Sequence, residues 1–335
     1  MLLFAAGAAA PPAPSMPQAD RLSANQLAVI VNGADPLSGQ IADYYRLRRQ
    51  IPASNIIHVS FPPGRPVMSA AAFRKIKTAI DAKTPPRVQA YVLTWVQPYR
   101  VECMSITTAF AAGFDRAYCS QACGRTRPNP YFNSDSHAPY TELGLRPTIV
   151  LAGRRFEDAK RLIDRGVASD GSFPSGTGYL LSTDDAPRNV RAAMYPTIVR
   201  SLMDRLDLKV VNANYIENRD RVLFYFTGVA TVERLESIGF LPGAIADHLT
   251  SAGGQLVNSS QMSALRWLEA GATGSYGTVV EPCNHQSKFP SPGILMRHYL
   301  RGDSLIEAYW KSVAWPGEGI FVGEPLAAPF APRRH

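Results

Sequence analysis

Apolar runs alternate with amphipathic segments along most of the chain. Residues 27–32 (LAVIVN) form an almost continuous apolar run, which is typical of a strand buried on both faces of a sheet. In residues 38–49 the apolar side chains recur at helical intervals, and Pro52 follows this predicted helix. The alternation continues with a predicted strand at 56–60, a helix at 69–82 and a strand at 88–95. Strands separated by helices of this length predict a parallel sheet with right-handed crossovers.

The alternation lapses over residues 97–145, which are rich in Pro, Asn, Ser and Tyr and contain three of the four Cys. An irregular segment of this length within a domain is usually functional or poorly ordered. Beyond it the pattern predicts strands at 148–152, 178–182, 208–213, 222–227, 275–280 and 320–322, and helices at 155–167, 190–206, 262–270, 292–301 and 304–313. We therefore predict an α/β protein with helices flanking a mostly parallel sheet. Residues 23–96 and 146–330 form two α/β halves or one wide sheet, and 331–335 form a tail.

The first 22 residues resemble a targeting segment. MLLFAAGAAA is apolar and ends in small residues, and a Pro/Ala-rich spacer follows, as expected of a secretory signal. The first basic residue is Arg21, whereas a signal begins with positive charge, so either the true start lies upstream of Met1 or the segment is only a tail. We predict export to the periplasm or beyond. No later apolar run reaches the roughly 18 to 20 residues that span a bilayer, so we expect no transmembrane segment after signal removal.

Composition narrows the class of protein further. Of the 335 residues, 46% are hydrophobic and 19% are charged, which excludes wholesale disorder, collagen and coiled coil. The formal charge of +8 comes from 28 Arg and seven Lys scattered through nearly every segment. A nucleic-acid surface gathers its cations on one face beside aromatic side chains that stack on bases. We therefore do not expect a nucleic-acid partner.

Candidate chemistry sits where predicted strands end, because reactive groups of open parallel sheets lie past the carboxyl ends of strands. Glu281, Cys283 and His285 follow one such strand at intervals of two, so in extended backbone they project from the same face. A carboxylate, a thiol and an imidazole suit a metal site or an activated cysteine nucleophile. The alternative is a turn at Pro282, with Cys283 packed or in a disulfide. Asn32 lies at the carboxyl end of another predicted strand, residues 27–32.

Cys119 and Cys123 form a C-x-x-x-C pair in the irregular segment. In an exported protein a local disulfide between them is the first expectation. A zinc site that includes Cys103 or His137 and a pair of unrelated thiols are the alternatives. Zinc is the only cofactor that the sequence brings into consideration.

Several common catalytic motifs are missing. The sequence contains no G-x-x-x-x-G-K-[ST], G-x-S-x-G or H-E-x-x-H, so P-loop, elbow-type serine hydrolase and zincin chemistry lose their support. Asp247, His248 and Ser251 include the residue types of a serine triad, but triads assemble from distant loops. We interpret these three residues as a polar cluster at the end of a helix.

The stretch LAVIVNGADPLSGQIADYYRLRRQIPASNIIHV resembles the opening of an uncharacterised bacterial family found in genomes that encode exosortase. The resemblance continues in FLPGAIADHLTSAGG, WLEAGATGSYGTVVEP, YLRGDSLIEAYWKSV and VGEPLAAPF, and covers about residues 25–330. The family implies no established activity. More distantly, the layout resembles that of the gingipain and caspase-like cysteine peptidases, which implies a caspase-like or flavodoxin-like sheet.

In those peptidases a His-Gly follows one strand and a nucleophilic Cys follows the next. The position that resembles His-Gly is Thr227-Gly228, and residues 241–247, where the Cys is expected, contain none. This resemblance implies a peptidase-shaped protein without its dyad.

Two hypotheses follow. The first is a binding or accessory role at the cell envelope, in which a surviving cleft holds an extended peptide or glycan. We assign to this cleft Asn32, Asp35, Thr227, Gly228 and Gly243. The second hypothesis is a hydrolase with Cys283 as nucleophile, His285 or His248 as base and Glu281 as orienter.

Overall fold

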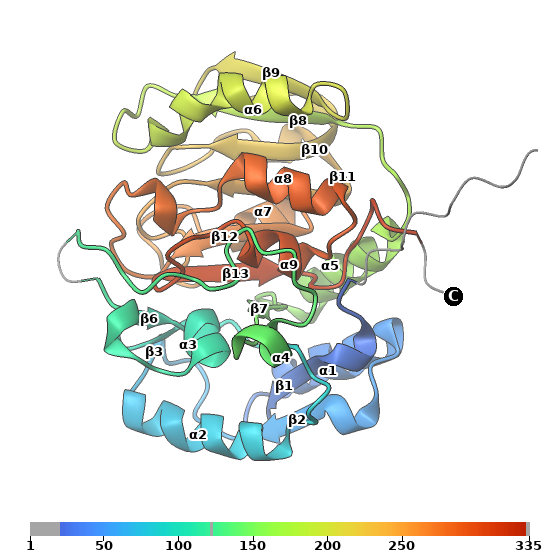
Figure 1. The fold of residues 1–335 in the computed structure, drawn as a ribbon, viewed down its shortest axis with the longest axis vertical. Coiled ribbons are helices and arrows are strands. Elements are labelled where there is room, and N and C mark those ends of the chain that lie inside the picture. Colours follow the sequence, from blue (N-terminus) through green and yellow to red (C-terminus); the bar gives the residue numbers. More distant parts are fainter. Residues whose placement is uncertain (1–20, 121–122, 333–335) are drawn as a thin grey trace, which may run out of the picture.

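Ten strands form one sheet that extends through the whole molecule (Figure 1). The computed structural model describes residues 21–120 and 123–332, so most of the signal-like segment lies outside the described residues. In spatial order the strands are β2 (Ile56–Val59), β1 (Leu27–Asn32), β4 (Ala90–Leu93), β7 (Thr148–Val150), β13 (Gly319–Gly323), β12 (Gly274–Thr278), β11 (Ile238–His248), β10 (Arg219–Thr227), β8 (Thr177–Ser182) and β9 (Asp207–Asn212). A small second sheet contains β3 (Val67–Met68), β5 (Arg100–Val101) and β6 (Met104–Ser105).

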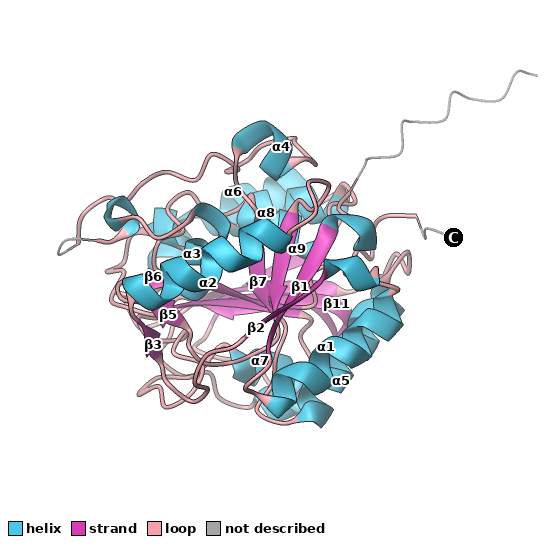
Figure 2. Cartoon of the chain, turned by 90° about the horizontal axis from the view of Figure 1, so that it is seen from below, coloured by secondary structure: helices cyan, strands magenta, loops and turns pink. Residues whose placement is uncertain are grey.

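Most neighbouring strands in the large sheet are parallel. This holds for β1, β2, β4 and β7, and for β8 to β12, whereas β13 runs antiparallel to β12. Helices cover both faces (Figure 2): α1, α5 and α7 lie on one, and α3, α6, α8 and α9 on the other. The predicted α/β class with a mostly parallel sheet is therefore confirmed. The helices are α1 (Pro36–Arg49), α2 (Ala70–Lys83), α3 (Ile106–Ala112), α4 (Pro139–Leu143), α5 (Phe156–Ser169), α6 (Tyr195–Leu202), α7 (Leu265–Ala270), α8 (Pro292–Leu300) and α9 (Leu305–Trp310).

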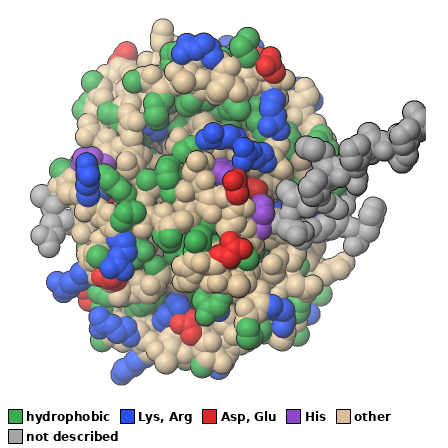
Figure 3. All heavy atoms as spheres, in the orientation of Figure 1, with side chains coloured by type: hydrophobic (Ala, Val, Ile, Leu, Met, Phe, Trp, Pro, Cys, Tyr) green, Lys and Arg blue, Asp and Glu red, His purple; other side chains and the backbone are tan. Residues whose placement is uncertain are grey.

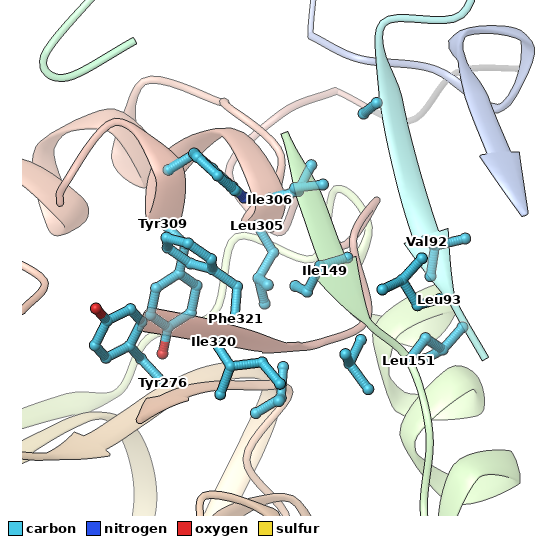
Figure 4. Packing of buried hydrophobic residues seen from close by; sticks show 14 of the residues in the cluster. Val92, Leu93, Ile149, Leu151, Tyr276, Leu305, Ile306, Tyr309, Ile320 and Phe321 are labelled. Carbon is cyan, nitrogen blue, oxygen red and sulfur yellow. The ribbon is translucent and has the colours of Figure 1, made fainter. Parts of the chain in front are cut away.

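The centre of the sheet is apolar and tightly packed. Figure 4 shows Ile320 and Phe321 of β13 between side chains of β7 on one side and of β12 and α9 on the other. Phe321 stacks on Trp310 with ring centroids 4.5 Å apart. A Cβ at Gly319 would lie 1.9 Å from the hydroxyl of Tyr276, so only glycine fits there.

Two expectations about the chain's local structure were wrong. Asp247 and His248 end a strand, β11, and not a helix, because Gly239, Pro242 and Gly243 mask the strand pattern of this segment. The predicted helix at 190–206 is a short 3-10 segment followed by α6, which restarts beside Pro196 because proline has no backbone N–H to donate. No helix within the described residues has the length and apolar character to cross a bilayer.

The four cysteines form two disulfides, and neither is the expected Cys119–Cys123 pair. Cys103 bonds to Cys119 within the irregular segment, and Cys123 bonds to Cys283, 160 residues further on. The second bond fastens the irregular segment to the loop after β12. In disulfides these sulfurs are not the thiolates that zinc binds, so the alternative of a zinc site has no ligands at Cys119 and Cys123.

We expect the longer disulfide to contribute more to stability. Loop-closure entropy grows with the logarithm of loop length, so separations of 160 and 16 residues differ by about 2 kcal/mol. The double variant C123S/C283S should therefore lose about that much more unfolding free energy than C103S/C119S, measured by urea denaturation. Equal losses, or peptide mapping that recovers a Cys119–Cys123 bond, would contradict this pairing.

Candidate functional site

Two adjoining pockets open where the loops after β4, β11 and β12 meet. The larger, of about 470 Å³, lies between the irregular segment, with Arg100 and Ser120, and the loop that follows β12. The smaller, of about 280 Å³, lies above the end of β11 beside Thr250 and Arg188. Glu281 and Cys283 line both pockets, so we treat them together as the edge cleft. A cleft of this size accommodates a segment of an extended chain.

Glu281, Cys283 and His285 lie together but do not form a catalytic triad. The Glu281 carboxylate accepts a hydrogen bond from the backbone N–H of Cys283 at 2.7 Å and does not orient the imidazole. The His285 ring donates through Nε2 to the carbonyl of Cys123 and packs against Trp315. Cys283 is bonded to Cys123 and has no thiol, so the hypothesis of a Cys283 nucleophile is wrong. The alternative, a turn with Cys283 in a disulfide, is confirmed.

A buried ion pair fills the space beneath the cleft. Arg191 Nη1 lies 2.6 Å from Asp247 Oδ1, and Arg191 Nη2 donates to the carbonyl of Thr227 at 2.7 Å. Both charged side chains are almost fully buried. Burial raises the pKa of the Asp247 carboxyl, and the Arg191 guanidinium opposes this shift. The ends of β10 and β11 are thus tied to the segment before α6.

Backbone closes the space above Thr227 and Gly228. A Cβ on Gly228 would lie 2.0 Å from the carbonyl oxygen of Arg188, so the chain at Arg188 rests directly on this glycine. Thr227 is fully buried. Neither residue lines the edge cleft, and the prediction that they do is wrong.

His248 cannot act as a base in this structure. Trp267 Nε1 donates to His248 Nδ1 at 3.0 Å, and His248 Nε2 donates to the carbonyl of Met262 at 3.0 Å. Both ring nitrogens are therefore engaged, and the ring is buried. Burial lowers the pKa of His248 to about 3, so the imidazole stays neutral. The hypothesis that His248 serves Cys283 as a base is wrong.

The other predicted binding residues have structural roles away from the cleft. Asn32 accepts from the backbone N–H of Phe61 and Asp35 caps α1 by accepting from Leu37. β1 lies six strands from β10, which is about 29 Å at the usual strand spacing. Gly243 is the middle residue of β11, has φ of +88°, and packs against Pro329 and Ser169. The five residues assigned to one cleft do not converge.

A charged network that the sequence did not indicate holds the irregular segment against α8 and α9. His137 Nδ1 lies 2.7 Å from the buried Glu307 carboxylate. Asp303 bonds His298 at 3.0 Å and Lys311 at 2.8 Å. Burial lowers the pKa of His137, but the Glu307 carboxylate more than offsets this, so the pKa lies above its usual value. The sequence feature that belongs to this network is the polar run NSDSH at residues 133–137. Its partner Glu307 lies 170 residues from His137, so a local pattern does not reveal the contact.

The described residues contain no group of three or more His, Cys, Asp or Glu side chains arranged to hold a metal ion.

Two solved structures resemble this one over most of its length. One, described as "Structure of Protease", is 10% identical with a TM-score of 0.50 and covers 93% of this chain and 80% of that chain. The other, "Complex of Porphyromonas gingivalis RgpB pro- and mature domains", is 8% identical with a TM-score of 0.50 and covers 91% and 79%. The fold is caspase-like and gingipain-like. At this identity the likeness concerns the fold alone.

No protein-family model matches the chain, and no curated protein matches it. The resemblance to the exosortase-associated family therefore stays a prediction.

Removing one partner of the buried ion pair should be costly. Arg191→Met leaves the Asp247 carboxylate without its countercharge, and we expect a loss of about 3–5 kcal/mol in unfolding free energy by chemical denaturation. Arg188→Met is the control, because Arg188 pairs with a partly exposed Asp185 and should lose about 1 kcal/mol or less. Similar losses in the two variants would show that Arg191 carries no special structural role.

Protonation of His248 should destabilise the fold in acid. The unfolded imidazole titrates near pH 6.5 and the folded one near 3, so between these values the unfolded chain binds the extra proton. Unfolding free energy should therefore fall as pH decreases from about 6.5 to 3, by up to roughly 5 kcal/mol from this residue. NMR should find the His248 ring neutral at pH 5. A ring that titrates near pH 6.5 in the native protein would exclude this account.

Proposed function

We propose that this protein is an exported, non-catalytic binding or accessory protein of the cell envelope, in which the edge cleft holds an extended peptide or glycan. One observation carries the proposal. The ends of β10 and β11, where the distant peptidase resemblance places a His-Gly and a Cys, are occupied by Thr227-Gly228 and the Arg191–Asp247 ion pair. These groups are buried, and the Arg191 guanidinium is held by the Asp247 carboxylate and the Thr227 carbonyl, so they are not exposed to a substrate.

The candidate nucleophile Cys283 and the candidate base His248 support the same conclusion. Cys283 is held in a disulfide, and the ring nitrogens of His248 bond to Trp267 and Met262. A nucleophile needs a base within hydrogen-bond reach, and neither of these groups meets that condition. The edge cleft lies next to these occupied positions and remains open.

The lining of the cleft suits recognition of an extended chain. Disulfide sulfurs and Val280 provide apolar surface, while Arg188 and Glu281 place opposite charges near each other. Backbone amides and hydroxyl groups of a peptide or glycan would find both donors and acceptors there. The two disulfides fit an oxidising compartment, in agreement with the signal-like N-terminus.

Binding without turnover is the expected result. Ser251 lines the smaller pocket, and Ser251→Trp should fill it and abolish capture of the protein by immobilised envelope fractions. Ser172→Trp, on an exposed loop outside the cleft, is the matched control and should bind as the unchanged protein does. Digesting the fractions with a peptidase or with glycan hydrolases before the assay separates the two ligand classes.

Two outcomes would contradict this proposal. Product formed from a peptide or ester library by the protein, and lost in Ser251→Trp but not in Ser172→Trp, would overturn the non-catalytic proposal. Equal capture of both variants would show that the cleft is not the binding site.

A further inference from the structure

A groove far from the edge cleft runs between strand β2 and helix α2. β2 is one of the two terminal strands of the ten-stranded sheet, and α2 lies beside it at the bottom of Figure 1. The groove has a volume of about 570 Å³. Gly33, His58 and Ser60 line it on the sheet side, and Ile76 and Ala79 line it on the helix side.

The outer edge of β2, beside this groove, has no neighbouring strand among the described residues. Gly33 N donates to the carbonyl of Val59 at 2.7 Å, so the peptide groups of Val59 face β1. In a parallel ladder the residues alternate, so the N–H and C=O of His58 point away from the sheet. An edge of this kind pairs readily with an added strand.

All charged side chains that line the groove are basic. Lys75 and Lys83 stand at its helical wall and His58 on its strand wall, and all three are exposed. Blue side chains are spread over the lower part of the molecule in Figure 3, where Figure 1 places α2. The groove therefore favours an anionic partner.

The spacing of the two lysines defines the partner more closely. Lys75 and Lys83 are eight residues apart on a helix, which is about 12 Å. In an extended chain the same distance corresponds to about four residues, and residues two apart share a face. Acidic side chains at positions i and i+4 would therefore meet the two lysines, and a small apolar side chain at i+2 would meet Ala79, midway between them.

We propose that the groove between β2 and α2 binds an extended acidic segment of a partner protein, which adds to β2 as a further strand. The recognised pattern is an acidic residue, an apolar residue and a second acidic residue at alternate positions. β2 lies five strands from β12, about 24 Å, so this surface is separate from the edge cleft and does not depend on it.

The test uses the labelled peptide Thr-Glu-Thr-Val-Thr-Glu-Thr and its Gln counterpart in fluorescence anisotropy at low salt. The Glu peptide should bind, and K75E and K83E should each weaken it about tenfold. Lys77→Glu is the matched control, because Lys77 lies on the same helix, does not line the groove and pairs with Asp81; its effect should stay within about twofold. If K77E weakened peptide binding as much as K75E and K83E do, net charge alone would explain the effect, and the proposal would be overturned.

A separate variant tests whether the peptide binds by adding to β2 as a strand. His58→Pro removes an outward N–H, which an edge strand tolerates, and should abolish peptide binding while the far-UV circular dichroism stays unchanged. Full binding by a correctly folded H58P variant would exclude strand addition. Binding of polyglucuronate in place of the Glu peptide would assign the groove to an anionic glycan and refute the proposal. Ser251→Trp should leave peptide binding intact, so failure here is distinguishable from failure of the cleft proposal.

Discussion

The last strand of the chain holds the two parts of the sheet together. β13 lies between β7, which neighbours the N-terminal strands, and β12, which neighbours the C-terminal ones. All five of its residues are buried, and the aromatic stack of Phe321 on Trp310 continues its packing into α9. No other described strand makes this connection, so the sheet exists as one layer only after residues 319–323 are in place. Folding of the two parts is thereby coupled to the C-terminus.

Buried charges extend this coupling beyond the strand. Glu324, directly after β13, is fully buried and accepts hydrogen bonds from Tyr45 at 2.7 Å and from Arg49 Nε at 3.0 Å, both on α1. The Arg191–Asp247 pair in turn joins the segment before α6 to β11. Such pairs contribute little net stability, yet each is costly to break on one side. These buried pairs therefore determine which segments of the chain pack against each other. Apolar strands alone would not determine this, because most of them have similar sequences.

The predictable part of the fold was the part with uniform local patterns. β4 is apolar throughout and β1 is apolar except for Asn32 at its end, so the sequence predicts both as buried strands. β11 does not, because Pro242 and Gly243 interrupt it at positions where the backbone bends and packs against Pro329. The candidate site was harder still. Four cysteines allow three pairings, and only tertiary structure selects the one that joins Cys123 to Cys283 across 160 residues.

The net charge of +8 acquires a different meaning once the arginines are located. A few of them make buried contacts inside the protein. Arg191 lies beneath the cleft, and Arg165 donates to the carbonyls of Leu268 and Ala272 at the end of α7, where burial lowers its pKa to about 10. A planar guanidinium can bridge such carbonyls, which a lysine ammonium does less well.

The seven lysines are distributed differently from the arginines. Two of them, Lys288 and Lys311, are buried in ion pairs, whereas Lys75, Lys77 and Lys83 all lie on α2. A lysine that merely kept the protein dispersed could stand on any exposed helix. Their concentration on α2, which borders the free edge of the sheet at β2, gives part of the basic character of this chain a location, which the count of charges alone did not.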